Sequence, residues 1–405
     1  MRLTINKSVA TGKIIAPPSK SYAHRLLIAA AFTNQTTVVK NIVMSNDIIA
    51  TTNCLRTLGY KLEYNEQNKE MYISKENKEL PDTLVFDAME SGSTLRFMIP
   101  IALTTGKRLI FKGTPRLIER GIDTYIELFK EQDIKIEKNI DNIIITGLLK
   151  PGEFIIKNTI SSQYITGLLF ATSLLNGDST IFIPEDLASK SYIDITIDVL
   201  KKVNIKIEET KTSYFIKGNQ KYKDNTFFVE GDYSNAAFID ALNYLGGNVE
   251  IQGLNEKSLQ GDKVYKEYFD KLSKGYEKID LSNCIDLGPI LFGFSGLFYG
   301  GHFINTSRLK VKESNRVEDV KIELEKLGIE VIDLGNEVIV KNDNLHSPSK
   351  ILKGHKDHRI IMMLSVLLTR LSGTIENTED VSKSYPNFFI DLMNLGIEVK
   401  NEEKR

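Results

Sequence analysis

Small polar and cationic residues gather at the beginning of several strongly apolar segments of the sequence. Four of these openings are Pro17–Arg25, Glu90–Arg96, Ser161–Tyr164 and Lys356–Arg359. If each apolar segment forms a helix, its N-terminus carries unpaired N–H groups and a partial positive charge, which together favour a bound anion. A helix dipole contributes about 0.3–1 kcal/mol and a hydrogen bond to a charged group about 1.5–3 kcal/mol, so Lys and Arg must provide most of the binding. The openings predict a site for a polyanion, most simply one with phosphate and carboxylate groups.

A simpler interpretation treats the polar residues at these openings as ordinary helix N-caps. The cap positions are Ser19, Ser91, Ser161 and Asp232. Capping is sufficient for any one of them. It does not explain why cations recur just inside helices that are otherwise apolar. These cations are Lys20, Arg25, Arg96 and Arg359.

A second charged cluster lies in Lys310–Arg316. On a helix Lys312 and Arg316 would share one face, four residues apart, with Glu313 beside them. Most such runs are the solvated start of a helix. The alternative is a phosphate clamp in which Glu313 carries a proton, with a pKa set by bound cations and anions.

Further candidates stand outside these two groups. Asp286 stands at the beginning of an apolar helix and is either its N-cap or a general base that faces a cationic site. Gly92 lets a ligand approach the backbone closely. Arg116, Arg120 and Lys383 are additional cations in short polar motifs.

Composition excludes several classes of function. The chain has 405 residues, a net charge of −1, and two cysteines, Cys54 and Cys284, without metal-site spacing. The length predicts two domains, and the charge argues against nucleic-acid binding. No Gly-rich nucleotide loop, metal-ligand cluster, membrane span or signal peptide is recognisable, so we expect a cytoplasmic enzyme without a metal or other cofactor.

A repeated pattern must supply the elements that position these residues. A Leu-x-x-Leu-Gly helix, a strand and an apolar helix recur six times, with Gly-like turns at positions 59, 133, 204, 275, 328 and 396. The apolar helices are predicted to be inner ones, at 19–32, 91–103, 161–175, 232–245, 286–298 and 357–371. The charged Leu-x-x-Leu-Gly helices are predicted to be outer ones, and the shorter interval before position 328 suggests a trimmed unit around Gly253–Gly275. Six units of this kind predict an α/β fold of two similar domains.

The motifs, taken in order, resemble those of the 5-enolpyruvylshikimate-3-phosphate synthase family of enolpyruvyl transferases. The resemblance runs almost from end to end. The residues that carry it are Pro18–Ser21, Arg25, Ser91–Ser93, Arg96, Pro115–Arg116, Ser161–Gln163, Ser189–Asp194, Glu230–Asp232, Val311–Ser314, Arg316, Asp357–Arg359 and Lys383–Pro386.

The resemblance implies two similar domains, each of three βαβαββ-type units around buried parallel helices, an inside-out α/β barrel. The first domain would contain residues 1–18 and 231–405, the second residues 19–230, and the active site would lie in the cleft between them. The family acts in the shikimate pathway, which leads through chorismate to the aromatic amino acids. The implied partners are small-molecule substrates only, with no nucleic acid or membrane, and the implied state is a monomer.

The resemblance also implies the reaction. The 5-hydroxyl of shikimate 3-phosphate adds to C2 of phosphoenolpyruvate, C3 is protonated, and the tetrahedral intermediate loses phosphate. Residues implied to serve the proton transfers are Asp286, Glu313, Lys20 and Lys312. Shikimate 3-phosphate would bind Lys20, Ser21, Arg25, Ser161, Ser162, Gln163, Ser189, Tyr192, Asp286 and Lys312. Phosphoenolpyruvate, or the herbicide glyphosate in its place, would bind Lys20, Gly92, Arg96, Arg116, Gln163, Arg316, Arg359 and Lys383.

The sequence departs from the family pattern at Glu90, where Asn is usual, at Ser93, where Thr is usual, and at Asn315, where Asp is usual. Two alternatives fit the residues less well. The sister transferase that acts on UDP-N-acetylglucosamine relies on a loop cysteine, which neither Cys54 nor Cys284 matches. A non-catalytic polyanion-binding protein would not need Asp286 and Glu313 together with their neighbouring cations.

Overall fold

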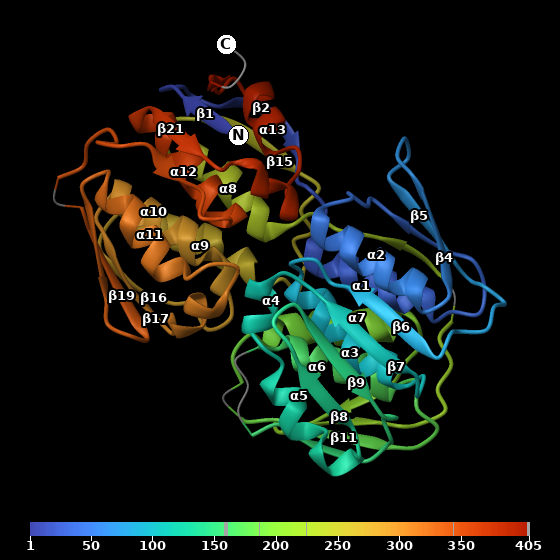
Figure 1. Cartoon of the computed structure of the whole chain (residues 1–405). Coiled ribbons are helices and arrows are strands. Elements are labelled where there is room, and N and C mark those ends of the chain that lie inside the picture. The colour runs from blue at the N-terminus through green and yellow to red at the C-terminus, as the bar shows by residue number, and fades with distance from the viewer. Residues whose placement is uncertain (158–160, 186, 224, 343, 403–405) are drawn as a thin grey trace. The chain divides into compact units, whose positions relative to one another are not determined.

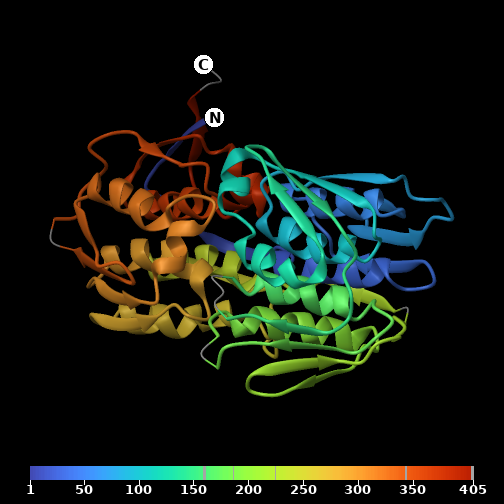
Figure 2. The same cartoon turned by 60° about the horizontal axis from the view of Figure 1, so that its bottom comes forward.

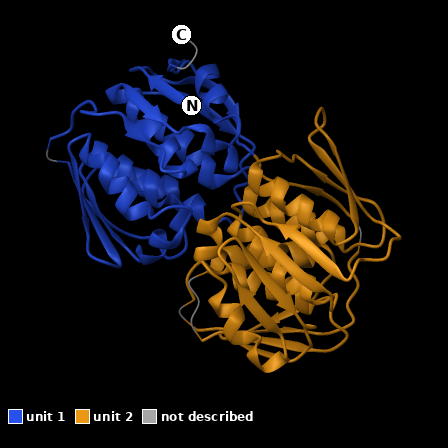
Figure 3. Ribbon diagram, viewed as in Figure 1, with its two compact units in different colours: residues 1–17, 231–405 blue, residues 18–230 orange. Residues whose placement is uncertain are grey.

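The computed structural model describes residues 1–157, 161–185, 187–223, 225–342 and 344–402. Within this part of the chain the fold divides into two compact units (Figure 3). One contains Met1–Pro17 and Gly231–Arg405, and the other contains Pro18–Glu230. The expected division placed Pro18 in the first unit, whereas the structure places it in the second.

The apolar segments of the unit Pro18–Glu230 form its inner helices (Figure 1). They are α1 (Lys20–Ala31), α3 (Gly92–Leu103) and α6 (Gln163–Thr172). In α3 every residue except Ser93 and in α6 every residue except Gln163 is buried, as predicted for helices without a polar face. The remaining helices are α2 (Asn46–Thr57), α4 (Pro115–Glu119), α5 (Asp123–Leu128), η1 (Lys130–Gln132) and α7 (Lys190–Lys202).

Small four-stranded sheets cover these helices. Each sheet has one parallel pair followed by two antiparallel neighbours, and the strand orders are β14-β3-β5-β4, β6-β7-β9-β8 and β10-β11-β13-β12. The strands are β3 (Thr37–Lys40), β4 (Tyr60–Asn65), β5 (Glu70–Lys75), β6 (Thr83–Asp87), β7 (Arg108–Lys112), β8 (Lys135–Lys138), β9 (Asn142–Thr146), β10 (Glu153–Ile155), β11 (Ser179–Phe182), β12 (Ile207–Glu209), β13 (Ser213–Ile216) and β14 (Thr226–Phe228).

The unit that contains both ends of the chain repeats this plan. Its inner helices are α8 (Tyr233–Tyr244), α10 (Gly288–Leu297) and α12 (His358–Leu371). The outer helices are α9 (Tyr265–Leu272), α11 (Arg316–Glu325) and α13 (Phe388–Asn394). Short 3-10 turns are η2 (Gly261–Val264), η3 (Ile285–Leu287), η4 (Ser307–Val311) and η5 (Glu379–Lys383). Figure 2 shows the helices of each unit side by side, with strands on the outer faces.

The sheets of this unit have the orders β16-β17-β19-β18, β20-β21-β1-β22 and β15-β2. Their strands are β1 (Arg2–Ile5), β2 (Thr11–Ile15), β15 (Asn248–Gln252), β16 (Glu277–Asp280), β17 (Gly301–Ile304), β18 (Ile329–Asp333), β19 (Glu337–Asn342), β20 (Leu352–Lys353), β21 (Gly373–Glu376) and β22 (Val399–Asn401). Among the described residues β15 pairs only with β2, which confirms the trimmed unit expected near Gly253–Gly275.

The predicted two-domain α/β fold is therefore confirmed, and its repeated βαβαββ order is continuous in three places along the described chain. These copies are β6–β9, β10–β13 and β16–β19 with their helices. The predicted helix stops are also confirmed, because Gly59, Gly328 and Gly396 have φ values of 87°, 76° and 90°. A residue without a Cβ adopts this left-handed conformation at least cost, so it ends a helix and turns the chain into the next strand.

Candidate active site

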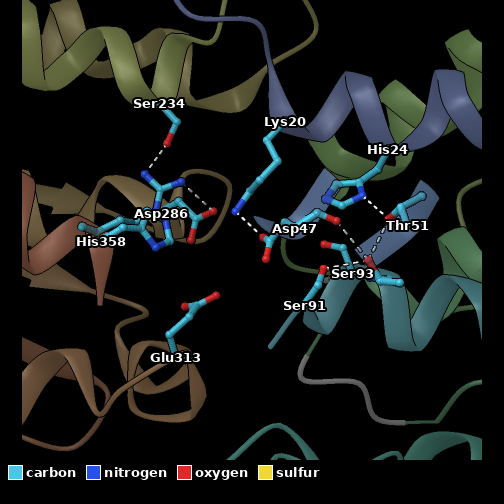
Figure 4. A network of polar contacts seen from close by, with 12 residues as sticks. Lys20, His24, Asp47, Thr51, Ser91, Ser93, Ser234, Asp286, Glu313 and His358 are labelled. Carbon is cyan, nitrogen blue, oxygen red and sulfur yellow. Dashed lines mark hydrogen bonds and ion pairs between the residues drawn. The ribbon is translucent and has the colours of Figure 1, made fainter. Parts of the chain in front are cut away.

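Lys20, the first residue of α1, forms an ion pair inside the unit Pro18–Glu230. Its Nζ lies 2.7 Å from Oδ2 of Asp47, and the two side chains are 18% and 13% exposed (Figure 4). Asp47 lies in the first turn of α2 and is not among the residues predicted from the sequence. An acidic residue in the first turn of a helix is common, so its position gave no signal of a functional role.

A chain of hydrogen bonds joins the beginnings of α1, α2 and α3 (Figure 4). His24 Nδ1 lies 2.7 Å from the Thr51 hydroxyl, which lies 2.7 Å from the Thr94 hydroxyl, which donates to Ser91 Oγ at 2.8 Å. Burial, assisted by the charges of Lys20 and Arg25, holds the pKa of His24 well below its usual value, so the ring is neutral. The chain fixes these helix starts relative to one another.

Arg25 is buried and bound by its own unit. Its Nε donates to Thr196 Oγ1 at 2.7 Å, Nη2 donates to Thr166 Oγ1 at 3.2 Å and Nη1 donates to the Ser21 carbonyl at 2.8 Å. Its guanidinium also lies over the Phe97 ring. Burial lowers its pKa to about 10, so it stays charged at neutral pH. The contacts fix this charge among α1, α6 and α7.

Arg96 and Gln163, both assigned to anion binding by the sequence, contact each other. Arg96 Nη1 donates to Gln163 Oε1 at 2.7 Å, while Gln163 Nε2 donates to Ser93 Oγ at 3.0 Å. Arg96 Nη2 donates to the Gly121 carbonyl at 3.1 Å, and its guanidinium stacks on the Tyr164 ring. These contacts bring the openings of α3 and α6 together.

Gly92 makes room for two guanidinium groups. A Cβ at this position would lie 2.9 Å from Arg96 Nη1 and 3.1 Å from Arg120 Nη2. Because such distances are shorter than ordinary contacts, any larger residue must displace these side chains. Gly92 is therefore important for the geometry of the cations themselves, as well as for ligand access to the backbone.

The remaining predicted residues of this unit lie at three helix starts. Ser161 Oγ accepts from the Gln163 amide at 3.3 Å, and Ser162 is the N-cap of α6, although its side chain makes no capping bond. Ser189 precedes α7 with φ of 62°, and Tyr192 lies in the first turn of that helix. Arg116, in α4, is partly exposed and pairs with Glu119 at 3.1 Å.

The N-cap interpretation is confirmed for Ser19, Ser91 and Asp232, and it is wrong for Ser161, because the N-cap of α6 is Ser162. Their side chains accept from the amides of Tyr22, Thr94 and Asn235. Capping and anion binding are compatible at these helix starts, because a cap satisfies one of the several unpaired N–H groups.

The second group of candidate residues lies in the unit that contains both chain ends, and Arg316 is its centre. Its side chain is 1% exposed and contacts Asp357, Glu313 and Asp286 at 2.8, 2.6 and 2.9 Å. Burial opposes its charge, but these carboxylates outweigh burial and raise its pKa above the usual value. Arg316 is therefore a permanent cation.

Three cationic side chains from separate parts of this unit contact the Asp286 carboxylate. Its Oδ1 lies 3.2 Å from Lys312 Nζ and 2.9 Å from Arg316 Nη1, and its Oδ2 lies 3.2 Å from Arg359 Nη2. Its alternative role as an N-cap is wrong. Asp286 belongs to η3, and α10 begins only at Gly288, with no side-chain capping bond.

The expected helix through Lys312 and Arg316 is also wrong. The turn η4 ends at Val311, Lys312 is extended, and α11 begins at Arg316, with Asn315 as a cap that accepts from the Glu318 amide. The two cations meet at Asp286 because the chain bends between them. Burial lowers the pKa of Lys312, although the Asp286 charge raises it in part. Asn315, where the family usually has Asp, thus retains a capping role.

Arg359 and Lys383 complete this group. Arg359 donates from Nη1 to Ser234 Oγ at 2.6 Å, a partner that the sequence analysis missed (Figure 4). Asp357 caps α12 by accepting from the Arg359 amide at 2.9 Å. Lys383 is 4% exposed and donates from Nζ to the Lys356 carbonyl at 2.6 Å.

The described residues contain no cluster of metal ligands, no membrane-spanning helix and no exposed thiol. In this part of the chain no group of three or more His, Cys, Asp and Glu residues could hold a metal ion, and no helix is long and apolar enough to cross a membrane. Cys54 and Cys284 are both buried, and burial raises the pKa of each thiol. A protonated, buried thiol is a poor nucleophile.

The fold is that of the enolpyruvyl transferases. Solved structures with this fold include the EPSP synthase of Acinetobacter baumannii and the enolpyruvyl transferase NikO of Streptomyces tendae. The first has a TM-score of 0.79 and 21% identity, and covers 99% of this chain and 100% of its own. The second has a TM-score of 0.78 and 13% identity, and covers 98% of each chain.

Sequence comparison decides the family within this class. The family model described as EPSP synthase (3-phosphoshikimate 1-carboxyvinyltransferase) matches residues 5–392. Relatives named 3-phosphoshikimate 1-carboxyvinyltransferase include those of Clostridium acetobutylicum, 39% identical over 98% of this chain and 97% of its own, and Clostridioides difficile, 38% identical over 97% of each. The chain therefore belongs to the EPSP synthase family, as its motifs predicted.

Proposed function

We propose that this chain transfers the enolpyruvyl group of phosphoenolpyruvate to the 5-hydroxyl of shikimate 3-phosphate and releases inorganic phosphate. The observation that carries the proposal is the Asp286 carboxylate, which contacts Lys312, Arg316 and Arg359. A carboxylate beside several fixed cations can accept a proton from a hydroxyl while the cations bind the phosphate and carboxylate groups of the substrates. The family membership supports the same reaction.

Substrate contacts are assigned to the same residues that the resemblance implied. Shikimate 3-phosphate is assigned to Lys20, Ser21, Arg25, Ser161, Ser162, Gln163, Ser189, Tyr192, Asp286 and Lys312. Phosphoenolpyruvate is assigned to Lys20, Gly92, Arg96, Arg116, Gln163, Arg316, Arg359 and Lys383. The contacts between Arg96 and Gln163 and between Arg359 and Asp286 support these sets, because each joins residues assigned to the same ligand or reaction.

In the proposed mechanism the 5-hydroxyl oxygen forms a bond to C2 of phosphoenolpyruvate while C3 gains a proton. Asp286 takes the hydroxyl proton. Lys20, Lys312 and Glu313 are assigned to hold or return protons, and each of them lies against a group of opposite charge. Loss of a proton from C3 and cleavage of the C2–O bond to phosphate then leave the enolpyruvyl ether. The fixed cations stabilise the phosphate as it departs.

The test is a phosphate-release assay with the purified chain. We expect phosphate only when shikimate 3-phosphate and phosphoenolpyruvate are both present, and an enolpyruvyl ether detectable by mass spectrometry. Replacement of shikimate 3-phosphate by UDP-N-acetylglucosamine is the matched control. Equal turnover with the nucleotide sugar, or none with either acceptor, would refute the proposal.

We extend the proposal to a monomeric cytoplasmic enzyme that binds neither nucleic acid nor membrane. Light scattering of the purified protein at micromolar concentration tests this, and a mass near 45.7 kDa is the expected result.

A further inference from the structure

His355 lies between two carboxylates of a neighbouring helix. Its Nδ1 is 3.0 Å from Asp319 Oδ1, and its Nε2 is 2.7 Å from Glu323 Oε1. Asp319 and Glu323 are four residues apart on α11, so both face the same side of that helix. A ring with a carboxylate at each nitrogen donates from both, which requires the charged imidazolium.

Glu323 anchors this contact within the fold. Its side chain is 0% exposed and also binds Lys326 Nζ at 2.8 Å and the Lys353 amide at 2.9 Å. Although burial disfavours the charge of Glu323, these donors lower its pKa. The carboxylate is therefore fixed and ionised, and it holds the segment before α12 through both a side chain and a backbone amide.

The turn that contains His355 has an unfavourable backbone conformation. His355 and Lys356 have φ values of 50° and 54°, and two consecutive non-glycine residues in this region are strained. Such a conformation persists only where surrounding contacts impose it. The contacts of His355 with α11 are well placed to do so.

Lys383 and Arg359, which are both assigned to phosphoenolpyruvate, depend on this turn. The Lys356 carbonyl accepts from Lys383 Nζ at 2.6 Å. The next residue, Asp357, caps α12 through the Arg359 amide and binds Arg316. A shift of the turn would therefore move both Lys383 and Arg359.

We propose that His355 is a positioning residue, whose ring ties the turn before α12 to α11 and thereby holds Arg359 and Lys383 in their observed places. This inference rests on the proposed function for its effect on turnover. Its structural part concerns only contacts within one unit.

The contact of His355 with the two carboxylates depends on pH, because it requires a charged ring. The charged groups that face His355 are Asp319 and Glu323. Lys326 Nζ lies 2.8 Å from both carboxylate oxygens of Glu323. Burial lowers the pKa of His355, but the two carboxylates outweigh it and raise the pKa to about 9. The pKa of His355 in the folded state exceeds its value near 6.5 in the unfolded chain. The contribution of this contact to the stability of the fold is therefore complete below about pH 6.5 and is lost as pH rises through about 9.

The first experiment measures structure without substrate, with His355→Gln, the charge-retaining His355→Arg, and His302→Gln as the matched control. His302 also pairs with a carboxylate, Glu337, but lies on β17. In His355→Gln we expect faster amide hydrogen exchange confined to residues 355–361, with His355→Arg and the control close to the native protein. Unchanged exchange, or a rise throughout the unit, would overturn the proposal.

The second experiment measures kinetics on the same variants. In His355→Gln we expect the KM for phosphoenolpyruvate to rise roughly tenfold to a hundredfold, with a smaller change in kcat and substantial recovery in His355→Arg. In the native protein this KM should rise above pH 8, and His355→Arg should lack that rise. Native kinetics in His355→Gln would contradict the inference, whereas an inactive native protein would contradict the proposed function and leave hydrogen exchange to decide the positioning role.

Discussion

Arg316 and Asp357 form an ion pair that is sealed from solvent. Arg316 Nε lies 2.8 Å from Asp357 Oδ2, and the side chains are 1% and 0% exposed. Asp357 also caps α12, the helix that carries Arg359. One carboxylate thus fixes a cation at the start of α11 and orients the beginning of α12.

The Asp357 carboxylate should be essential for stability. We expect Asp357→Ala to lower the free energy of unfolding by about 3–5 kcal/mol, because it leaves the buried Arg316 without its main partner and removes a helix cap. Denaturation in urea measures this effect. Glu330→Ala removes the exposed pair with Lys341 in the same unit and should change the midpoint little. Equal effects in the two variants would argue against a structural role for the buried pair.

Replacement of Asp286 should reduce turnover far more than it reduces the binding of shikimate 3-phosphate. In Asp286→Ala the cations Lys312, Arg316 and Arg359 lose a shared carboxylate, so the site becomes more positive and still attracts anions. We expect kcat to fall by about 10²–10⁴-fold, the usual contribution of a general base. Calorimetry with shikimate 3-phosphate should still detect binding. Loss of binding together with turnover would instead assign Asp286 a structural role.

Any side chain at position 92 should weaken the binding of phosphoenolpyruvate. In Gly92→Ala the new methyl group must displace Arg96 and Arg120, so we expect the KM for phosphoenolpyruvate to rise roughly tenfold or more. Inhibition by glyphosate, which the family resemblance places in the same site, should weaken as well. Gly275→Ala is the control, since a Cβ there would meet no atom of the described residues within 4 Å. Identical kinetics in both variants would show that the close contacts at Gly92 relax freely.

His24 should make the protein less stable in weak acid. Its pKa is lowered in the folded state, so its stabilising contribution is complete above the unfolded value near 6.5 and is lost as pH falls below it. This one residue can change the free energy of unfolding by at most about 1.4 kcal/mol per pH unit. Urea denaturation between pH 7 and 5 should show this slope in the native chain and a smaller slope in His24→Asn. A slope that is the same in both proteins would mean that His24 is charged when folded.

The sequence by itself determined the scaffold and the choice of most candidate site residues. Helix starts such as Ser19 and Ser91, and stops such as Gly59 and Gly328, follow from caps and from backbone conformations that only a few residue types accept readily. Apolar runs predicted the buried helices, because a helix without a polar face must be covered. These signals are local, so they can be read without knowing the fold.

Only the tertiary structure decided which charges meet. Asp47 pairs with Lys20 across 27 residues and Ser234 binds Arg359 across 125, and no local pattern links either pair. The same limit explains the wrong helix at Lys312, because a cap at Asn315 competed with a regular charge spacing and prevailed. His355 contacts Asp319 and Glu323 on α11, and no local sequence pattern indicates these partners. Charge pairing depends on distance in space, and the packing of the helices sets that distance.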